Sequence, residues 1–337
     1  MANLHEVFIE FDNDIIKLSS TRKSELRKSR NAIRADIDRF FEENRPDHTV
    51  HFKGQGSFVM NTTILPISGE YDVDDGVYIF GKTENRPSTQ TAHNWIYDAV
   101  KDRTGQETID KNTCVRVKYA KQYHVDLPIY YKIEHSENEI AFDTSDIPLL
   151  AHKSKGWILS DPYAFKLWFD QQAANSPQIK RLVRYIKAWA DKRQTDNEKL
   201  IFPSGLVFTI LICNNYSPNE RDDVSLLETL KIIQARIDDR KKPLASYACF
   251  RPTVDKNENL LEKFSATTTK NNFLDSLDSF IVSGNQAVEM KSKKDACAKW
   301  QKHFGDRFPC SNIVEDPEEI AKSFVYPDQI KTDNKSA

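Results

Sequence analysis

Three aspartates stand in sequence contexts that suit the binding of divalent cations. Asp72 and Asp74 are two residues apart in the segment EYDVDDGVYIF, residues 70–80, which alternates polar and apolar side chains. Side chains at positions i and i+2 of a β-strand point to the same face, so we expect these two carboxylates to lie together and Asp75 to point away. Asp126 lies between two apolar residues in another strand-like segment. Convergent carboxylates suit Mg²⁺, and two ions about 4 Å apart can activate a hydroxyl and stabilise leaving pyrophosphate.

A glycine-serine turn lies upstream of these aspartates. The letters GQGS occupy residues 54–57, after a short apolar stretch. Where such a turn enters a helix, it presents backbone N–H groups and a hydroxyl to phosphate oxygens. An Asp-x-Asp pair alone is also typical of a solvated strand face or a turn, and a Gly-Ser pair alone predicts little. The turn together with Asp72, Asp74 and the distant Asp126 indicates a metal-dependent phosphate site.

The first half of the chain must position these residues, and its pattern predicts α+β structure. A 3.6-residue apolar period predicts an amphipathic helix over residues 24–44. Alternation predicts strands over residues 112–120 and 123–133, which could pair antiparallel around Lys121 and Gln122. A further helix is expected over residues 91–103.

The second half reads as helical. Ser160-Asp161-Pro162 is a helix start, because an oxygen-bearing side chain can cap the first turn and the proline that follows is tolerated at its first position. A compositional shift near residue 155 divides the chain into two expected domains, 1–155 and 156–337, which we expect to share a cleft. The tail from Asp316 is polar, and we expect it to be frayed. Further helices are expected over residues 178–193, 206–213, 222–237, 271–282 and 287–303.

Length and composition exclude several classes of protein. The 337 residues suffice for two domains. The 48 basic and 50 acidic residues give a net charge of −2, which argues against a dedicated nucleic-acid coat or a membrane-surface binder. The longest apolar run, residues 206–213, is far shorter than the ~20 residues of a membrane span. We see no signal peptide at the N-terminus.

The five cysteines are odd in number and scattered, and no two have the CxxC spacing. The pattern therefore indicates neither a zinc site nor a disulfide framework. We expect reduced thiols in a cytoplasmic protein. The histidines His93, His124 and His303 lack metal-ligand spacing, and we interpret them as surface or core residues.

The combination of Gly56-Ser57, Asp72-x-Asp74 and Asp126 resembles the signature of the polymerase-β nucleotidyltransferase superfamily. More narrowly, the sequence resembles the bacterial cyclic-dinucleotide synthases related to animal cyclic GMP-AMP synthase, the CD-NTases, and among them the branch typified by the Vibrio cyclic GMP-AMP synthase. The matching stretches keep their order along the chain: QGSF (55–58), EYDVDDGVY (70–78), HVDLPIY (124–130), WILSDP (157–162), KAW (187–189), PSG (203–205) and FGDRF (304–308).

The resemblance implies a fold and a set of site residues. The fold would be α+β, with a polymerase-β-like core of mixed or antiparallel sheet and helices, a helical C-terminal lobe of the oligoadenylate-synthase type, and the active site in the cleft between them. Two Mg²⁺ ions, for which Mn²⁺ can substitute, would be bound by the three catalytic aspartates. Gln55, Gly56 and Ser57 would contact the donor triphosphate. Lys187 and Ser204 would bind phosphates as well, and Arg116 would lie near the acceptor nucleotide; the alternatives are a solvated helix lysine for Lys187 and an ordinary helix N-cap for Ser204.

The resemblance also implies an activity: a synthase that joins NTPs, ATP or GTP or both, into a cyclic di- or oligonucleotide and releases pyrophosphate. The product would activate a separate effector in bacterial antiphage (CBASS) defence. The chain lacks a His/Cys zinc cluster like that of the animal DNA sensor, so we expect no DNA activator, and no membrane partner either. Two alternatives stay open: a nucleotidyltransferase that modifies an RNA end or a small molecule, and a catalytically inactive nucleotide-binding scaffold. The near-neutral charge speaks against an RNA substrate, and the intact aspartates speak against an inactive scaffold.

Overall fold

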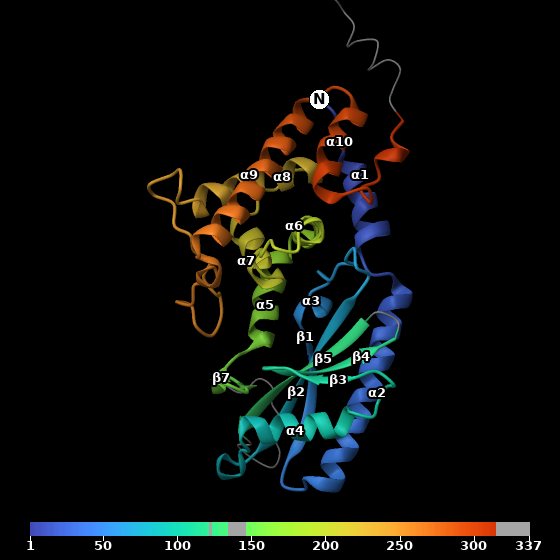
Figure 1. Ribbon diagram of the computed structural model, residues 1–337, viewed down its shortest axis with the longest axis vertical. Coiled ribbons are helices and arrows are strands. Elements are labelled where there is room, and N and C mark those ends of the chain that lie inside the picture. Colours follow the sequence, from blue (N-terminus) through green and yellow to red (C-terminus); the bar gives the residue numbers. More distant parts are fainter. Residues whose placement is uncertain (121–122, 134–145, 315–337) are drawn as a thin grey trace, which may run out of the picture.

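The computed structural model describes residues 1–120, 123–133 and 146–314, and these form a sheet lobe and a helical lobe (Figure 1). The connection runs through α5, which leads from the sheet lobe into the helices. In chain order the elements are α1 His5–Glu10, the π-helical segment Phe11–Ile16, α2 Ser20–Asn44, β1 Thr49–Gln55, α3 Gly56–Val59, β2 Tyr71–Gly81, the short turn Thr83–Asn85, α4 Thr89–Val100, β3 Thr108–Asp110, β4 Cys114–Tyr119, β5 Tyr123–Ile133, β6 Leu149–His152, β7 Gly156–Leu159, α5 Pro162–Ala173, α6 Pro177–Asp196, α7 Gly205–Asn215, α8 Asp222–Ile237, the turn Glu262–Phe264, α9 Thr267–Glu289, α10 Lys293–Phe304 and the turn Cys310–Asn312.

The described strands form one mixed sheet. Its order is β1-β2-β5-β4-β3, and β6 joins it through β5 and carries β7. Strands β2 and β5 run parallel, and the other pairs are antiparallel. The predicted antiparallel pairing of the two segments on either side of Lys121 and Gln122 is confirmed as β4 and β5, although these two residues lie outside the described part. The α+β fold class predicted from the sequence is therefore confirmed.

Period-two alternation gives the central strands β2 and β5 one apolar face and one functional face. On β2, Val73, Val77 and Ile79 are buried in the core beneath α2 and α4. On the same strand, Asp72 and Asp74 point to the opposite face, as alternation requires. The apolar face holds the sheet to its helices, so the opposite face is free to carry polar groups.

The helical lobe has its own core, built from α5 to α10 and from the first residues of the chain. Trp189 of α6 is fully buried, and its ring stacks on Phe280 of α9 with centroids 5.1 Å apart. Phe8 and Phe11, before α2, belong to this core rather than to that of the sheet. The N-terminal segment lies beside α10 in Figure 1. The chain therefore starts in the helical lobe, builds the sheet lobe and then returns.

The predicted helices occur, with shifted ends. α8 has the predicted bounds, and α5 starts after the expected cap: the Asp161 carboxylate accepts a hydrogen bond from the Ala164 N–H at 2.9 Å. α9 extends to Glu289, beyond its expected end, and α10 therefore starts later, at Lys293. The Ser292 hydroxyl caps this new start by accepting from the Asp295 N–H at 3.1 Å. Helix propensity alone did not indicate that the chain breaks between Glu289 and Lys293.

The expectation that the cysteines are reduced is wrong for two of them. Cys297 of α10 and Cys310 are joined by a disulfide. The two cysteines are 13 positions apart, and the segment between them includes the end of α10 and a turn at Gly305, whose φ of +80° lets the chain fold back along the helix. The sequence spacing could not show this reversal. Cys114, Cys213 and Cys249 are free and buried.

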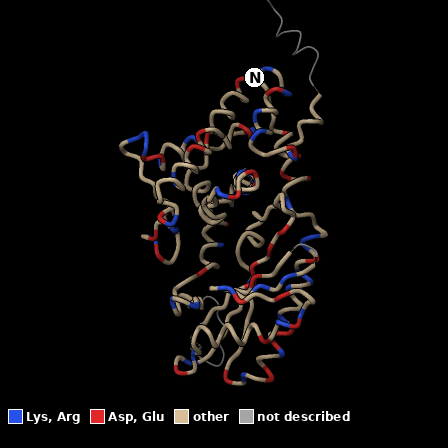
Figure 2. Tube along the Cα trace, viewed as in Figure 1, with Lys and Arg blue, Asp and Glu red and all other residues tan. Residues whose placement is uncertain are grey.

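Charged residues of both signs are interspersed over the two lobes (Figure 2). This distribution fits the net charge of −2 and leaves neither lobe with a single sign of charge in that view. Within the described residues, no helix combines the length and the apolar character that a membrane crossing needs.

Candidate active site

Four polar residues of β2 and β5 meet on the face of the sheet that α2 and α4 leave uncovered. The parallel register pairs Asp72 with His124 and Asp74 with Asp126. Neighbouring residues of paired strands share a face, so the four side chains form two adjacent rows. The register continues into β4, where Arg116 stands opposite Asp126. Residues about 50 positions apart in the sequence thus lie side by side, and the three predicted metal-binding aspartates are brought together.

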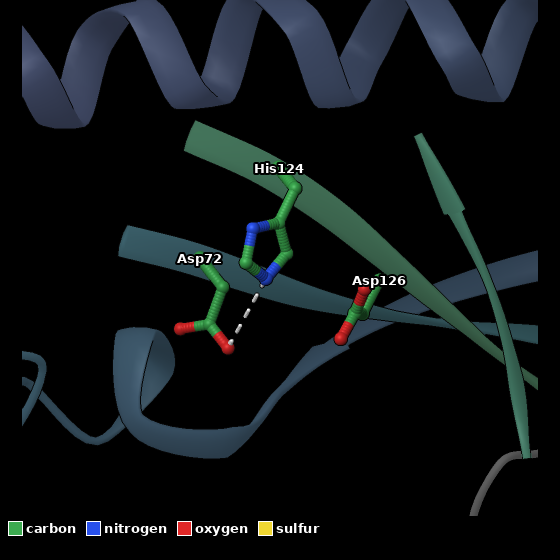
Figure 3. Close-up of side chains that lie close together, drawn as sticks. All are labelled: Asp72, His124 and Asp126. Carbon is green, nitrogen blue, oxygen red and sulfur yellow. Dashed lines mark ion pairs between the residues drawn. The ribbon is translucent and has the colours of Figure 1, made fainter. Parts of the chain in front are cut away.

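The distances within this group are short. Asp72, His124 and Asp126 each have one nitrogen or oxygen atom within 4.8 Å of those of the other two (Figure 3). Asp126 is 7% exposed and His124 is 6% exposed, whereas the Asp72 side chain keeps 40% of its surface accessible. Solvent therefore reaches this group of side chains at Asp72, whereas Asp126 and His124 are buried.

Asp74 shows the electrostatic consequence of this crowding. Burial raises the pKa of Asp74 well above its usual value, and the nearby carboxylates of Asp72 and Asp126 raise it further. Arg116 and Lys187 oppose this rise without cancelling it. An added divalent cation would supply the missing positive charge. The oxygen donors present therefore fit the hard ions, Mg²⁺ or Mn²⁺, that the nucleotidyltransferase fold implies.

Asp75 points to the opposite face, as the strand pattern predicts. It is fully buried and accepts two hydrogen bonds from the Arg34 guanidinium of α2, at 2.5 and 2.7 Å. Arg34 neutralises this carboxylate within the protein. Asp75 is therefore a structural residue, although it is a sequence neighbour of Asp74.

Arg116 binds Asp126 directly. Its Nε and Nη2 donate to the two carboxylate oxygens at 2.6 and 2.7 Å. This bidentate geometry holds Asp126 in one orientation. Arg116 was predicted to lie near an acceptor nucleotide, and the structure places it beside the carboxylate that would contact the attacking hydroxyl.

The glycine-serine turn packs against this group. Gly56 has φ of +68°, and a Cβ there would lie 2.1 Å from the Asp74 Oδ2. Glycine is thus required both by the backbone and by the close approach of the carboxylate. The Ser57 hydroxyl lies 2.8 Å from that of Thr63. Gln55 donates from Nε2 to the Tyr130 hydroxyl at 3.2 Å, which fixes its amide beside the turn.

Lys187 reaches the same turn from the helical lobe. Its amino group donates to the carbonyl and hydroxyl oxygens of Thr62 at 3.1 and 3.3 Å. A Cβ on Gly205 would lie 2.9 Å from the Lys187 Cε, so the glycine leaves space for the side chain. Burial lowers the pKa of Lys187 to about 8, against the pull of Asp72. The lysine is thus part of the cleft and not a solvated helix residue.

A cavity of about 940 Å³ joins these elements. Its size suits a nucleotide, since ligand pockets span roughly 300–1,000 Å³. Gln55, Gly56, Ser57, Asp72, Asp74, Lys187 and Ser204 all line it. Asp126, His124 and Arg116 are not part of the lining and lie on the neighbouring strands. Ser204 is exposed at the start of α7, and its side chain makes no cap hydrogen bond there.

The sequence interpretation missed several residues of this site. Arg251, Thr253, Val254, Asp255 and Glu258 come from one chain reversal that borders the cavity, in which Phe250 pairs with Asn259. His124 was interpreted as an ordinary histidine. Its two-residue spacing from Asp126 was the available signal, because it places both side chains on one strand face.

Comparison with known proteins now identifies the sheet lobe. Residues 50–130 match the family model described as "Cyclic GMP-AMP synthase DncV-like, nucleotidyltransferase domain". The chain carries a DncV-like nucleotidyltransferase domain. The resemblance to the bacterial CD-NTases and the polymerase-β superfamily is therefore confirmed, and the matched segment contains the turn and all three aspartates.

A curated cyclic GMP-AMP synthase from Escherichia albertii is 30% identical over 196 residues, which is 54% of this chain and 41% of that protein. The match thus spans about two fifths of the relative's length. Crystal structures extend the likeness in fold. The Vibrio cholerae DncV cyclic AMP-GMP synthase in complex with the linear intermediate 5′ pppA(3′,5′)pG has a TM-score of 0.75 at 20% identity, over 94% of this chain and 100% of that one. A Vibrio cholerae DncV mutant in complex with ATP and GTP has a TM-score of 0.76 at 18% identity, with the same coverage. These structures confirm the two-lobed fold.

Proposed function

We propose that this protein is a cyclic dinucleotide synthase that joins two NTPs through successive nucleotidyl transfers. The proposal is supported chiefly by the positions of Asp72, Asp74 and Asp126, which lie on one face of the sheet beside the glycine-serine turn. Asp72 and Asp74 also line a cavity large enough for a nucleotide. The confirmed DncV-like domain supports the same chemistry.

Each transfer forms one bond and breaks one. The acceptor ribose oxygen bonds to the donor α-phosphorus, the bond from that phosphorus to the bridging oxygen breaks, and pyrophosphate leaves with its electron pair. Two divalent ions bound by Asp72, Asp74 and Asp126 would neutralise the charge on the phosphates. Asp126 would orient the attacking hydroxyl and ease the loss of its proton. A second transfer in the opposite sense closes the ring.

The donor triphosphate is bound by residues of both lobes. The backbone of Gly56 and the hydroxyl of Ser57 would contact its oxygens from the sheet lobe, and Lys187 and Ser204 would contact them from the helical lobe. All four residues line the cavity. With its pKa near 8, Lys187 is largely charged at neutral pH and can pair with phosphate. This division of contacts requires the lobes to hold the nucleotide between them.

ATP and GTP are the proposed substrates, with a cyclic GMP-AMP-like product. The related Vibrio cholerae protein is described as a cyclic AMP-GMP synthase and was crystallised with both nucleotides. We further propose that this protein acts in the bacterial cytoplasm, without a DNA activator, and that its product signals to a separate antiphage effector.

Incubation of the purified protein with radiolabelled NTPs and Mg²⁺ or Mn²⁺ tests the proposal. We expect a phosphatase-resistant product without any added acceptor, and mass spectrometry of a mixed-NTP reaction then gives its bases and ring size. Labelling that depends on an added RNA or small molecule would support the alternative transferase. The absence of any turnover with either ion would contradict an enzymatic role. Added double-stranded DNA should leave the rate unchanged.

Lys187→Ala provides a check on the assignment of the phosphate-binding residues. The loss of a charged phosphate contact should lower kcat/KM for NTPs by about tenfold or more. An unchanged kcat/KM would show that Lys187 bonds only to Thr62.

A further inference from the structure

His124 is buried beside the three aspartates, and one of its ring nitrogens has no hydrogen-bond partner. The residue is 6% exposed, and its Nε2 makes no hydrogen bond within the described part of the chain. The Asp72 Oδ2 is 3.9 Å from this nitrogen, which is too far for a hydrogen bond. A buried polar atom left in this state costs about 1–3 kcal/mol, so a ligand bound at this nitrogen would recover that free energy.

The other buried histidines do not share this feature. His93 lies 2.6 Å from Asp110 through Nδ1 and 3.2 Å from the Ala151 carbonyl through Nε2. His303 places its Nε2 2.8 Å from the Ser283 hydroxyl. Of these three buried histidines, only the one that borders the carboxylates has a buried ring nitrogen without a hydrogen bond from the described residues.

The other ring nitrogen of His124 shows where the lone pair lies. Its Nδ1 is 3.1 Å from the Glu70 Oε1, and a carboxylate oxygen can only accept a hydrogen bond. Nδ1 therefore carries the hydrogen, and in the neutral ring Nε2 presents its lone pair. Histidines that bind metal ions usually donate their second nitrogen to a carboxylate in this manner.

The lone pair is directed at the carboxylates. In Figure 3 the Nε2 edge of the imidazole faces the space between Asp72 and Asp126. The three candidate ligand atoms lie within 4.8 Å of one another. At metal–ligand distances of about 2.1 Å, opposite ligands of an octahedral ion are roughly 4.2 Å apart and adjacent ligands roughly 3.0 Å apart. Three ligands include at most one opposite pair, so side-chain movements on the order of 1–2 Å would close the site around one ion.

We propose that His124 Nε2 is a metal ligand in this site, together with Asp72 and Asp126, and that the site binds Mn²⁺ in preference to Mg²⁺. Mg²⁺ favours all-oxygen ligand sets, whereas imidazole nitrogen suits first-row transition ions. Mn²⁺ accepts both oxygen and nitrogen and keeps octahedral geometry. This inference rests on the proposed function in one respect, which is that the divalent ions bind at the same aspartates.

Pulsed electron paramagnetic resonance of bound Mn²⁺ tests the nitrogen ligand without any turnover. The full-length protein is freed of metal with a chelator and then given less than one equivalent of Mn²⁺, with no nucleotide present. We expect electron-spin-echo modulation from a directly bound imidazole ¹⁴N. Incorporation of ¹⁵N-histidine should replace this signal with that of ¹⁵N, and this control needs no mutation.

Three substitutions extend the test. His124→Asn keeps a donor toward Glu70 but removes the Nε2 atom, so the ¹⁴N signal should vanish and the Mn²⁺ Kd should rise at least about tenfold, with about a twofold change for Mg²⁺. His303→Asn, in an equally buried histidine of the helical lobe, should change neither Kd. Glu70→Ala should keep the ¹⁴N signal while weakening Mn²⁺ about tenfold, because Glu70 acts through the ring.

The outcomes separate this inference from the proposed function. Bound Mn²⁺ without nitrogen modulation in the wild-type protein would overturn the ligand assignment, even if the enzyme makes a cyclic product. If the protein shows nitrogen modulation but makes no cyclic product, the result would support His124 as a metal ligand and contradict the proposed synthase activity. Equal Kd values for Mg²⁺ and Mn²⁺ in the wild-type protein would overturn the proposed selectivity.

Discussion

Buried carboxylates occur in two kinds of surroundings in this molecule. In the helical lobe and on the helix-covered side of the sheet, an arginine donates two hydrogen bonds to each of several buried aspartates. On the cleft face, in contrast, no hydrogen bond from the described residues reaches the carboxylate of Asp74. The pairs are Asp12 with Arg184, Asp222 with Arg181, Asp223 with Arg221, and Asp75 with Arg34.

The difference is visible in the protonation of two aspartates. Burial alone would raise the pKa of Asp222, but hydrogen bonds from Arg181 and Gln178 lower it below its usual value. Burial also raises the pKa of Asp74, and there the neighbouring carboxylates add to the rise. The protein thus balances its structural charges internally, and among the site carboxylates it leaves Asp72 and Asp74, but not the arginine-bound Asp126, for an external cation. This contrast is a physical criterion for the active site that requires no homology.

The largest expected effect comes from Asp74→Asn. The substitution removes a metal-binding oxygen and should lower turnover by about a thousandfold or more, since metal charge stabilisation contributes several kcal/mol. It also removes a repelled buried charge, so without divalent ions the free energy of unfolding at neutral pH should stay equal or increase. Labelled-NTP assays and urea unfolding measure the two effects. Activity above a tenth of wild type would refute the metal assignment.

Asp75→Asn, one residue further, should have the opposite pattern. The substitution leaves the Arg34 guanidinium without its carboxylate partner, and the loss of one member of such a pair costs about 3 kcal/mol. Urea unfolding of this variant should therefore shift strongly, while the Mn²⁺ affinity of the folded protein stays within about threefold of wild type. If instead metal affinity collapses and stability is retained, the two faces of β2 do not differ as described.

The sequence predicted much of this contrast because strand alternation is a local property. The two-residue spacing placed Asp72 and Asp74 on one face and Asp75 on the other, and the glycine-serine turn indicated phosphate. The resemblance then supplied Lys187 and Ser204 from the other lobe, which no local pattern could connect to the aspartates.

The remaining features depend on the tertiary structure. The parallel register that sets His124 beside Asp72 is a pairing between segments about 50 residues apart, and strand patterns do not specify it. The same holds for the disulfide, which depends on the reversal at Gly305, and for Arg34, whose role depends on how α2 crosses the sheet. Single-sequence periodicity describes each element but not which elements meet.

His303 shows a third way to accommodate a buried titratable group, which is to lose the charge. Burial lowers its pKa to about 4, with smaller contributions in the same direction from the nearby charges of Lys302 and Arg193. In the unfolded chain its pKa is about 6.5, so below that pH the unfolded state binds more protons and stability falls as the pH decreases toward 4. At pH 5 this amounts to about 2 kcal/mol.

Urea unfolding of wild type and His303→Asn at pH 7.5 and pH 5 isolates this contribution. The loss of stability between the two pH values should be smaller in the variant by about 2 kcal/mol, because asparagine does not titrate. Equal losses in both proteins would mean that His303 is as easily protonated when folded as when unfolded.

The smallest expected effect is that of Arg116→Gln, which acts on Asp126. Among the three site aspartates, Asp126 both accepts hydrogen bonds from an arginine and belongs to the candidate metal ligands. The substitution removes a positive charge and two hydrogen bonds, so the carboxylate should attract cations more strongly, and the Mn²⁺ Kd without nucleotide should fall about tenfold. Lys118→Gln, two residues along the same face of β4, is the matched control and should change the Kd less than threefold. Tighter Mn²⁺ binding in the Arg116 variant, but not in the Lys118 variant, would show that Arg116 competes with the metal ion for the Asp126 carboxylate. An unchanged or weaker affinity would place Asp126 with the structural pairs and leave the metal to Asp72 and Asp74.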